Sequence, residues 1–395
     1  FCIVAPFAVM AQTLIRSFVC EEFEGIFEAN RNGQYEDKVT FEALGLAVAD
    51  IALGYCDNAN QAYREHKENL AVARSSFYDK LNGTRTSLSE AVVASSASKA
   101  IEIQDAVGFI QWDGLPGYRV FALDGNHLPK TEKRIKELRG TSQAPLPGTC
   151  VARFDLGRQL FDRVYLLEDA HQQESATLDD VAQDLGKNDL LIADRHYCID
   201  AFLTRLDQQS SSFIIRQHGR LKGVLLGQRR KIGRTATGMV YEQSMRLTKR
   251  DGAITVRRIT VELDNPTRDG DTEIHVLSNL PSKVNAKTII NLYARRWEEE
   301  TAFYHEQMCL NGELPSLGHH RAALFLFCIA TMAYNILQTL LSVLYAEHED
   351  EEVDELSFYY VSLEIERYTP GMLAVLEADD WARVTPRTTA RLAQL

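Results

Sequence analysis

Two aspartates have the type and setting to bind divalent metal ions. Asp124 follows the apolar segment 118–123, and Asp194 follows the apolar segment 189–193, so each comes directly after a predicted short strand. If these strands are parallel neighbours, both carboxylates lie at the edge of the sheet where α/β proteins commonly bind ligands. Carboxylate oxygens suit Mg²⁺ or Mn²⁺, which also accept phosphate oxygens. An aspartate after a strand is more often a turn or a helix cap, so the pair alone only suggests a metal site.

A third acidic residue stands in a more specific pattern. Tyr293, Arg296 and Glu300 are separated by three and four residues, which places them on one stripe of a helix. A carboxylate beside an arginine and a tyrosine suits the binding of a metal together with a phosphate. Taken alone, the same spacing also fits an amphipathic helix with a solvated charged face.

The elements that must position these residues can be predicted from the pattern of apolar and turn residues. Residues 1–105 have helical periodicity, whereas strands are predicted at 118–123, 149–154, 160–167, 189–193 and 212–216 with helices at 175–185 and 199–206. Residues 217–282 are β-rich with glycine turns, and a helix is predicted from about 285 past 307. This order predicts an α/β fold with a mixed sheet covered by helices.

The charge of the chain is unevenly distributed. The net charge of −12 over 395 residues argues against a protein that coats nucleic acid through general basicity. Between Phe213 and Arg258, however, twelve Lys or Arg residues face only two acidic ones. This run predicts a phosphate-binding surface, although a solvated β-ribbon is the simpler alternative. The basic residues that we expect to contact DNA are Arg216, Arg229, Arg230, Lys231 and Arg234.

The three motifs together resemble those of bacterial insertion-sequence transposases of the DDE class. The spacing of Tyr293, Arg296 and Glu300 is similar to the Tyr-Arg-Glu-Lys signature of the insertion-sequence-four-like family. Asp124 in Leu-Asp-Gly and Asp194 in Ala-Asp-Arg resemble that family's first and second catalytic aspartates. Segments 310–314 and 317–325 resemble the stretch that follows the signature helix. The resemblance covers roughly residues 116–340, with the motifs in the family's order.

The resemblance implies a division of the chain. It predicts an RNase H-like catalytic core over 116–216 and 283–345, interrupted by the basic β-rich insertion over 217–282. Residues 1–105 are then a helical N-terminal region, which either contacts DNA or forms an ordinary bundle. Residues 346–395 begin with an acidic run, which we interpret as a linker before a helical appendage.

The resemblance also implies the chemistry and the partners. Asp124, Asp194 and Glu300 would hold two Mg²⁺ or Mn²⁺ ions for phosphoryl transfer, while Tyr293 and Arg296 steady the phosphate backbone. The substrates would be double-stranded transposon ends and target DNA, and a homodimer on DNA is expected. Where the signature has Lys, this chain has Gln307, which can contact phosphate only through hydrogen bonds. None of the tryptophans lies in the insertion, so a hairpin route of cleavage is not predicted.

Two rival functions remain open from the sequence. One is a descendant of a transposase that binds DNA but no longer cuts it, which the acidic net charge and Gln307 favour. The other is a carboxylate-pair hydrolase acting on sugars, which gives no role to the basic insertion.

Several other features bear on the setting of the protein. His171 and Glu174 are interpreted as a helix N-terminal cap region, with a supporting role beside the metals as the alternative. The apolar segment 322–346 could span a bilayer, but its polar residues favour a buried core helix. The scattered cysteines form no CxxC pair, which predicts reduced thiols and a cytoplasmic protein without a membrane partner. Because the chain starts at Phe1 instead of Met, we expect a fragment or a trimmed protein.

Overall fold

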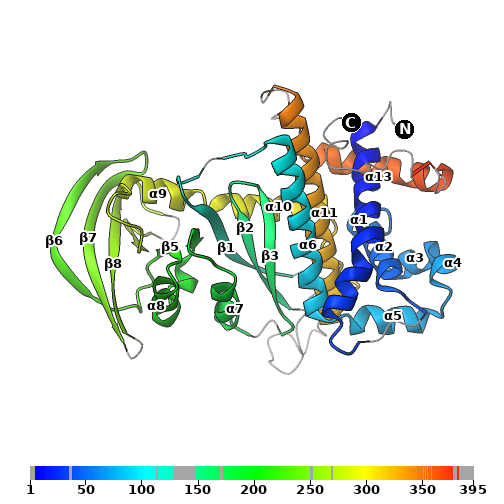
Figure 1. Ribbon diagram of the computed structural model, residues 1–395, viewed down its shortest axis with the longest axis horizontal. Coiled ribbons are helices and arrows are strands. Elements are labelled where there is room, and N and C mark those ends of the chain that lie inside the picture. The colour runs from blue at the N-terminus through cyan, green and yellow to red at the C-terminus, as the bar shows by residue number, and fades with distance from the viewer. Residues whose placement is uncertain are drawn as a thin grey trace.

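The computed structural model describes residues 5–34, 38–112, 114–128, 148–169, 172–249, 252–267, 270–349, 351, 353, 355–356, 358–376 and 380–381. Along the chain, helices come first and last, and the strands lie between them (Figure 1). Thr40 and Asn58 begin two of the N-terminal helices, where their side chains accept hydrogen bonds from backbone N–H groups of the first turn. The N-terminal helices are α1 (Pro6–Asn30), α2 (Phe41–Ala52), α3 (Ala59–Glu65), α4 (Lys67–Leu70), α5 (Arg74–Gly83) and α6 (Thr86–Val107).

A mixed sheet extends from the centre of the molecule to one of its ends. Its strands lie in the order β3-β2-β1-β4-β5-β9-β8-β7-β6 among the described residues. β1, β4 and β5 are parallel to one another, and the remaining neighbours pair antiparallel. The predicted mixed sheet flanked by helices is therefore confirmed. The first five strands are β1 (Arg119–His127), β2 (Thr149–Asp155), β3 (Leu160–Leu167), β4 (Asp189–Ala193) and β5 (Ser212–Arg216).

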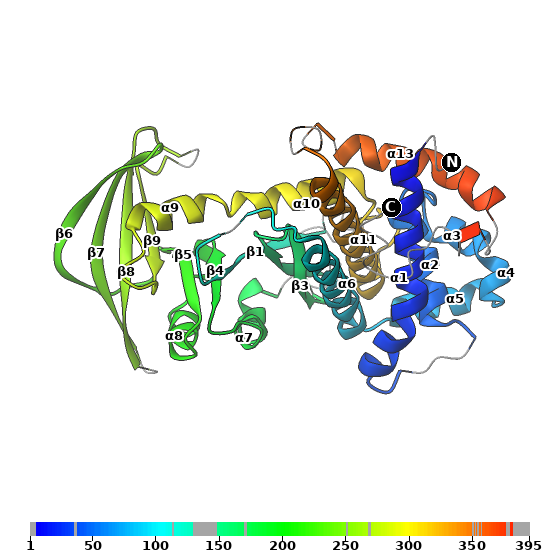
Figure 2. The ribbon, with the colours of Figure 1, turned by 45° about the horizontal axis from the view of Figure 1, so that its top comes forward.

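The β-rich segment after β5 continues the same sheet. β9 pairs antiparallel with β5 through Ile214 and Ser278, and β8, β7 and β6 follow outward from it. The views in Figures 1 and 2 place these long strands at the end of the molecule opposite to the N-terminal helices. The insertion is thus an extension of the central sheet. Its strands are β6 (Val224–Arg234), β7 (Gly238–Lys249), β8 (Gly252–Leu263) and β9 (Glu273–Ser278).

The two faces of the central strands pack against different helices. Phe121 and Leu123 of β1 belong to one apolar cluster with residues of α7 (Leu178–Gln183) and α8 (Asp200–Gln208). Val120 and Ala122 belong to the other, larger cluster, which includes residues of α9 (Ala286–Ala294), α10 (Trp297–Cys309) and α11 (His320–Glu347). Side chains alternate along a strand. Asp124 therefore points to the face that α9 and α10 cover. Short 3-10 turns, η3 (Glu174–Thr177) and η4 (Arg195–Tyr197), precede α7 and α8.

Helix α11 is the apolar segment for which the sequence left two interpretations. By length and composition it could cross a membrane, but 89% of its most apolar window is buried inside the protein. It packs against α6, α2 and β3, so it is the central helix of the core. α6 contacts both β3 and α11, and the N-terminal helices share one apolar cluster with the sheet. Helix α13 (Phe358–Val375) lies against α1 and α10.

Polar side chains from these helices form hydrogen bonds with the free edge of the outer strand β3. Asn335 of α11 is fully buried. Its Oδ1 accepts a hydrogen bond from Phe161 N at 3.0 Å, and its Nδ2 donates to Phe161 O at 2.9 Å and to Ser96 Oγ at 3.0 Å. Glu90 of α6 accepts a further bond from Leu166 N at 2.8 Å. These side chains take the place of a neighbouring strand, which an edge strand otherwise lacks.

We predict that Asn335→Leu lowers the free energy of unfolding by about 2–4 kcal/mol, because it leaves buried backbone groups of Phe161 unpaired. Urea unfolding monitored by circular dichroism measures this change. The control is Thr339→Val on the same helix, whose hydroxyl only donates to Asn335 O within the helix. Its expected effect is within about 0.5 kcal/mol. An equal loss of stability in the two variants would contradict the role of Asn335.

Candidate active site

Asp124 lies within β1, and not after it as the sequence predicted. The strand continues to His127 because β2 pairs with it as far as the Thr149–His127 position. On the other side, the parallel pairing with β4 ends at Leu123 and Ala193. Asp124 is therefore the first residue of β1 that extends beyond β4. Its Oδ1 accepts a hydrogen bond from Gly125 N at 2.9 Å.

Asp194 follows the last residue of β4, as expected. Since Ala193 is paired with Leu123, the two aspartates each come one residue after the same parallel pair. Asp194 Oδ1 lies 3.4 Å from the hydroxyl of Tyr293, which donates to it. Both aspartates thus lie where the carboxyl ends of two adjacent parallel strands meet.

The signature segment forms two helices instead of the single helix that the sequence predicted. α9 ends at Ala294 and α10 begins at Trp297, with a turn at Arg295 and Arg296 between them. Figure 2 shows the two helices running along the sheet one after the other. The break does not separate the predicted residues, because Tyr293 contacts Asp194, and Arg296 contacts both Asp124 and Glu300.

Arg296 connects two of the three acidic residues. Its Nη1 is 2.7 Å from Asp124 Oδ2, and its Nη2 is 2.7 Å from Glu300 Oε1. The Arg296 side chain is only 8% exposed, whereas those of Asp124 and Glu300 are 24% and 37% exposed. The guanidinium therefore pairs with both carboxylates from the buried side of the site.

Burial raises the pKa of Asp124 to about 6, although the Arg296 guanidinium and the Gly125 N–H oppose the shift. Burial, followed by the charge of Asp194, raises the pKa of the Tyr293 hydroxyl to about 12. Tyr293 is consequently a neutral donor at physiological pH. Asp124 loses its proton within the range from pH 5 to 7, where a bound cation would favour its charged form.

Two further glutamates surround Asp124. Glu299 is fully buried, and its Oε1 accepts a hydrogen bond from Asp124 N at 3.1 Å. Burial raises the pKa of Glu299 well above its usual range, which favours the neutral form of this carboxyl group. Glu174 accepts a hydrogen bond from the Tyr197 hydroxyl at 2.8 Å and lies so close to Gly125 that a Cβ there would be 2.2 Å from Glu174 Oε1. The cap region predicted around Glu174 is thus next to β1, and His171 lies outside the described residues.

The family model of the transposase DDE domain matches residues 116–336, more than half of the 395 residues. The chain belongs to the transposase DDE domain family. No curated protein matches the chain. DDE transposases generally use divalent metal ions. Within the described part of this transposase, no three His, Cys, Asp or Glu side chains are clustered closely enough to hold an ion as they stand.

The contacts of Gln307 differ from the predicted contact with DNA. Its Nε2 donates to Asn126 Oδ1 at 3.1 Å, so the side chain joins α10 to β1. Asn126 is two residues after Asp124 and therefore on the same face of the strand. Gln307 is thus engaged within the protein, and nothing in the spacing of the sequence indicates Asn126 as its partner.

Most of the predicted DNA-binding arginines of this transposase form ion pairs on the surface of the sheet. Several of the acidic partners lie after residue 258, beyond the stretch in which the sequence shows its excess of basic residues. Among the described residues, Lys231 has no carboxylate within ion-pair distance. The pairs are Arg216–Asp271, Arg229–Glu262, Arg230–Glu242 and Arg234–Asp264.

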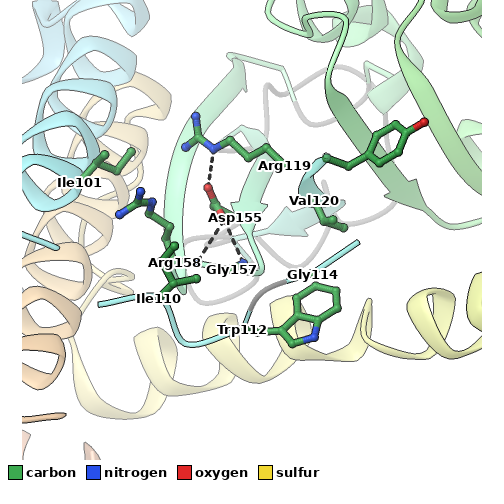
Figure 3. Close-up of a pocket in the computed structure, with 10 residues that line it drawn as sticks. Ile101, Ile110, Trp112, Gly114, Arg119, Val120, Asp155, Gly157 and Arg158 are labelled. Atoms are coloured by element: carbon green, nitrogen blue, oxygen red, sulfur yellow. Dashed lines mark hydrogen bonds and ion pairs between the residues drawn. The ribbon is translucent and has the colours of Figure 1, made fainter. Parts of the chain in front are cut away.

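Two cavities lie near opposite ends of the parallel strands β1 and β4. An open cavity of about 570 Å³ adjoins Asp194 and is lined by Arg195, His196, His218 and Arg220, among others. A smaller one of about 300 Å³ lies at the start of β1, where Arg119 and two backbone N–H groups bind Asp155 (Figure 3). The larger cavity is next to the end of β4, and the smaller one is at the start of β1.

We predict that Arg296→Met destabilises the metal-free protein by about 2–4 kcal/mol at pH 8, because it leaves ionised carboxylates without their cation. The loss should be smaller at pH 5. The pKa of Asp124 is higher in the folded protein than in the unfolded chain, so protonation of Asp124 at low pH stabilises the folded state. This contribution to the free energy of unfolding is lost as pH rises through about 6. Removing Arg296 raises that pKa further and steepens the loss.

Urea unfolding at several pH values measures this effect. The control is Arg295→Met, which removes an ion pair with Glu298 and a contact with the Trp112 ring but none with Asp124 or Glu300. Its cost should stay constant between pH 5 and 8. The same pH dependence in both variants would rule out the specific pairing of Arg296 with the acidic residues.

Proposed function

We propose that this chain is a DDE transposase of the insertion-sequence-four-like type, which cuts and joins DNA at transposon ends. The support comes from the contacts of two predicted site residues: Tyr293 donates to Asp194 at the end of β4, and Arg296 pairs with both Asp124 of β1 and Glu300 of α10. The five central strands in the order β3-β2-β1-β4-β5 agree with an RNase H-like core. This core would comprise residues 116–216 and 283–345, with 217–282 as its insertion.

The residues present fit a pair of Mg²⁺ or Mn²⁺ ions in their chemistry. The donors are hard carboxylate oxygens, and the Arg296 cation shared by Asp124 and Glu300 marks the place where positive charge is needed. The ions would supply activation of water, or of a 3′-hydroxyl, and stabilisation of the charge on the phosphate. Asp124, Asp194 and Glu300 would hold them. Arg296 would then turn from Asp124 towards the DNA phosphate, and Tyr293 would keep Asp194 in place.

The DNA would extend from this edge towards the insertion. Arg195, His196 and Arg220 line the open cavity beside Asp194, and Lys231, Arg230 and Arg234 lie exposed on β6. Both regions would contact the phosphate backbone. Arg216 and Arg229 would also contact phosphates after leaving their acidic partners. Gln307 would contact DNA only by leaving Asn126. Residues 1–105 would support the core and contact DNA near its edge, and residues 346–395 would form an acidic linker with a helical appendage. We expect a homodimer on paired ends and target DNA, acting in the cytoplasm without a membrane partner.

One observation favours a second candidate function, a descendant that binds DNA but no longer cuts it. Asp124 and Glu300 are neutralised by Arg296, and Gln307 is bonded to Asn126 instead of replacing the signature lysine. In that case the ion pair would be permanent. Mg²⁺-dependent cleavage by the wild-type chain separates the two functions, because a silent descendant binds the element's ends without cutting them.

We predict that Asp124→Asn slows Mg²⁺-dependent cleavage of the element's inverted-repeat ends by about 10³-fold or more, because a metal ligand is lost. Gel analysis of end-labelled duplexes measures the rate. The matched control is Glu298→Gln. The partners of Glu298 are Arg295 and Gln159, and not Arg296, which pairs with Asp124 and Glu300. Normal cleavage by Asp124→Asn would refute the catalytic assignment.

We predict that Lys231→Ala weakens binding to duplex DNA of any sequence and reduces the slope of log affinity against log salt by about one. The physical reason is the release of one counterion fewer when one phosphate contact is lost. Fluorescence anisotropy at several salt concentrations measures the slope. Lys99→Ala on α6 is the control, because Lys99 lies outside the insertion and already pairs with Glu22, so its slope should change less than that of Lys231→Ala. Unchanged slopes in both variants would remove the insertion from the DNA path.

A further inference from the structure

Glu299 is the one member of the Glu298–Glu300 run that points away from solvent. Glu298 pairs with Arg295, and Glu300 pairs with Arg296, and both side chains are about one-third exposed. Glu299 has no exposed surface, and its Oε2 has no hydrogen-bond partner. Among the described residues, its one hydrogen bond runs from Asp124 N to Oε1. The side chain therefore reaches under the site to the backbone of β1.

This bond ties a helix side chain to a backbone group that already belongs to the sheet. Arg119 N donates to Asn188 O on the β4 side of β1, and Val120 O accepts from Leu156 N on the β2 side. Because these directions alternate along a strand, the N–H of Asp124 is on the side of β2, where Asp124 pairs with Ala152. Glu299 therefore supplies a further acceptor at the residue that carries the first of the proposed catalytic carboxylates.

Packing alone does not account for a carboxyl group at this position. An apolar side chain of similar size would fill the same volume and would leave no oxygen unpaired in the core. Glu306, seven residues later on α10, is also fully buried, but it is hydrogen-bonded to the Thr331 hydroxyl of α11. The two buried glutamates thus connect α10 to different neighbours, and only Glu299 touches β1 at the site.

We propose that Glu299 is a positioning residue, which fixes α10 on β1 so that the carboxylates of Asp124 and Glu300 converge on the same place. The residue does not touch the DNA. It acts through the Asp124 backbone on one side and through its neighbour Glu300 on the other. This inference rests on the proposed function, because it assigns a role in aligning the proposed metal ligands.

The experiment compares Glu299→Leu and Glu299→Gln with the matched control Glu306→Leu in the full chain. Hydrogen–deuterium exchange of the β1 segment is measured without metal and without DNA, and cleavage of the element's ends is measured with Mg²⁺. In Glu299→Leu the Asp124 amide should exchange about tenfold faster, since one hydrogen bond is lost. Cleavage should slow by about 10- to 100-fold, as expected for misplaced catalytic groups.

The other two variants separate positioning from a general effect on the fold. Gln keeps an oxygen acceptor at the same reach, so Glu299→Gln should restore slow exchange and most of the cleavage. Glu306→Leu should leave both unchanged, because the Thr331 hydroxyl also donates to Phe327 O. The thermal midpoint of Glu299→Leu should not fall below that of Glu306→Leu by more than a few degrees.

Three results would overturn the proposal: unchanged exchange in Glu299→Leu, faster exchange with normal cleavage, or no rescue by Gln. If Glu299→Leu does not fold, Glu299→Asp takes its place, because the shorter side chain withdraws the acceptor while remaining polar. A wild-type chain that does not cleave would refute the proposed function instead. The exchange measurement would still report the hydrogen bond, so the two failures are distinguishable.

Discussion

The ion pair of Arg296 with Asp124 and Glu300 is the interaction on which the arrangement of the site depends. Two carboxylates come within reach of one guanidinium, which is itself only 8% exposed. Without a cation their repulsion would separate α10 from β1. Because Arg296 lies at the turn between α9 and α10, its placement also determines where α10 begins. A metal ion would satisfy the same electrostatic requirement, which connects the stability of the fold with its proposed chemistry.

The unequal lengths of β1 and β4 explain why the acidic residues meet. β4 ends at Ala193, so the chain turns away there and Asp194 follows directly. β1 continues along β2, and Asp124 extends past the end of its parallel neighbour. One strand thus presents its carboxylate from its end and the other from its side. α10 fills the space above the exposed part of β1, where Glu299 and Gln307 bond to Asp124 and Asn126.

The sequence predicted where the strands follow one another along the chain and which three acidic residues are candidates for the site. Strand periodicity and the signature spacing are local properties, which is why a sequence alone reveals them. It could not predict the turn at Arg295 and Arg296, since a break within a continuous helical pattern depends on the strands beneath it. It also did not reveal the burial of Glu299. Three consecutive glutamates differ by about 100° each around a helix axis. Which of them faces the core becomes clear only when β1 is in position, and the same holds for Asn335 at the edge of β3.

The charges of the insertion show a second limit of local patterns. A window from Phe213 to Arg258 contains the arginines but misses acidic residues that follow on β8, on β9 and in the turn between them. Antiparallel strands bring those residues back beside the arginines, so much of the apparent excess is neutralised within the sheet. Binding of DNA at a paired arginine would exchange one ion pair for another, with a smaller net gain than at an unpaired lysine. The affinity for DNA should therefore depend less on the number of basic residues than on those that the sheet leaves without an acidic neighbour.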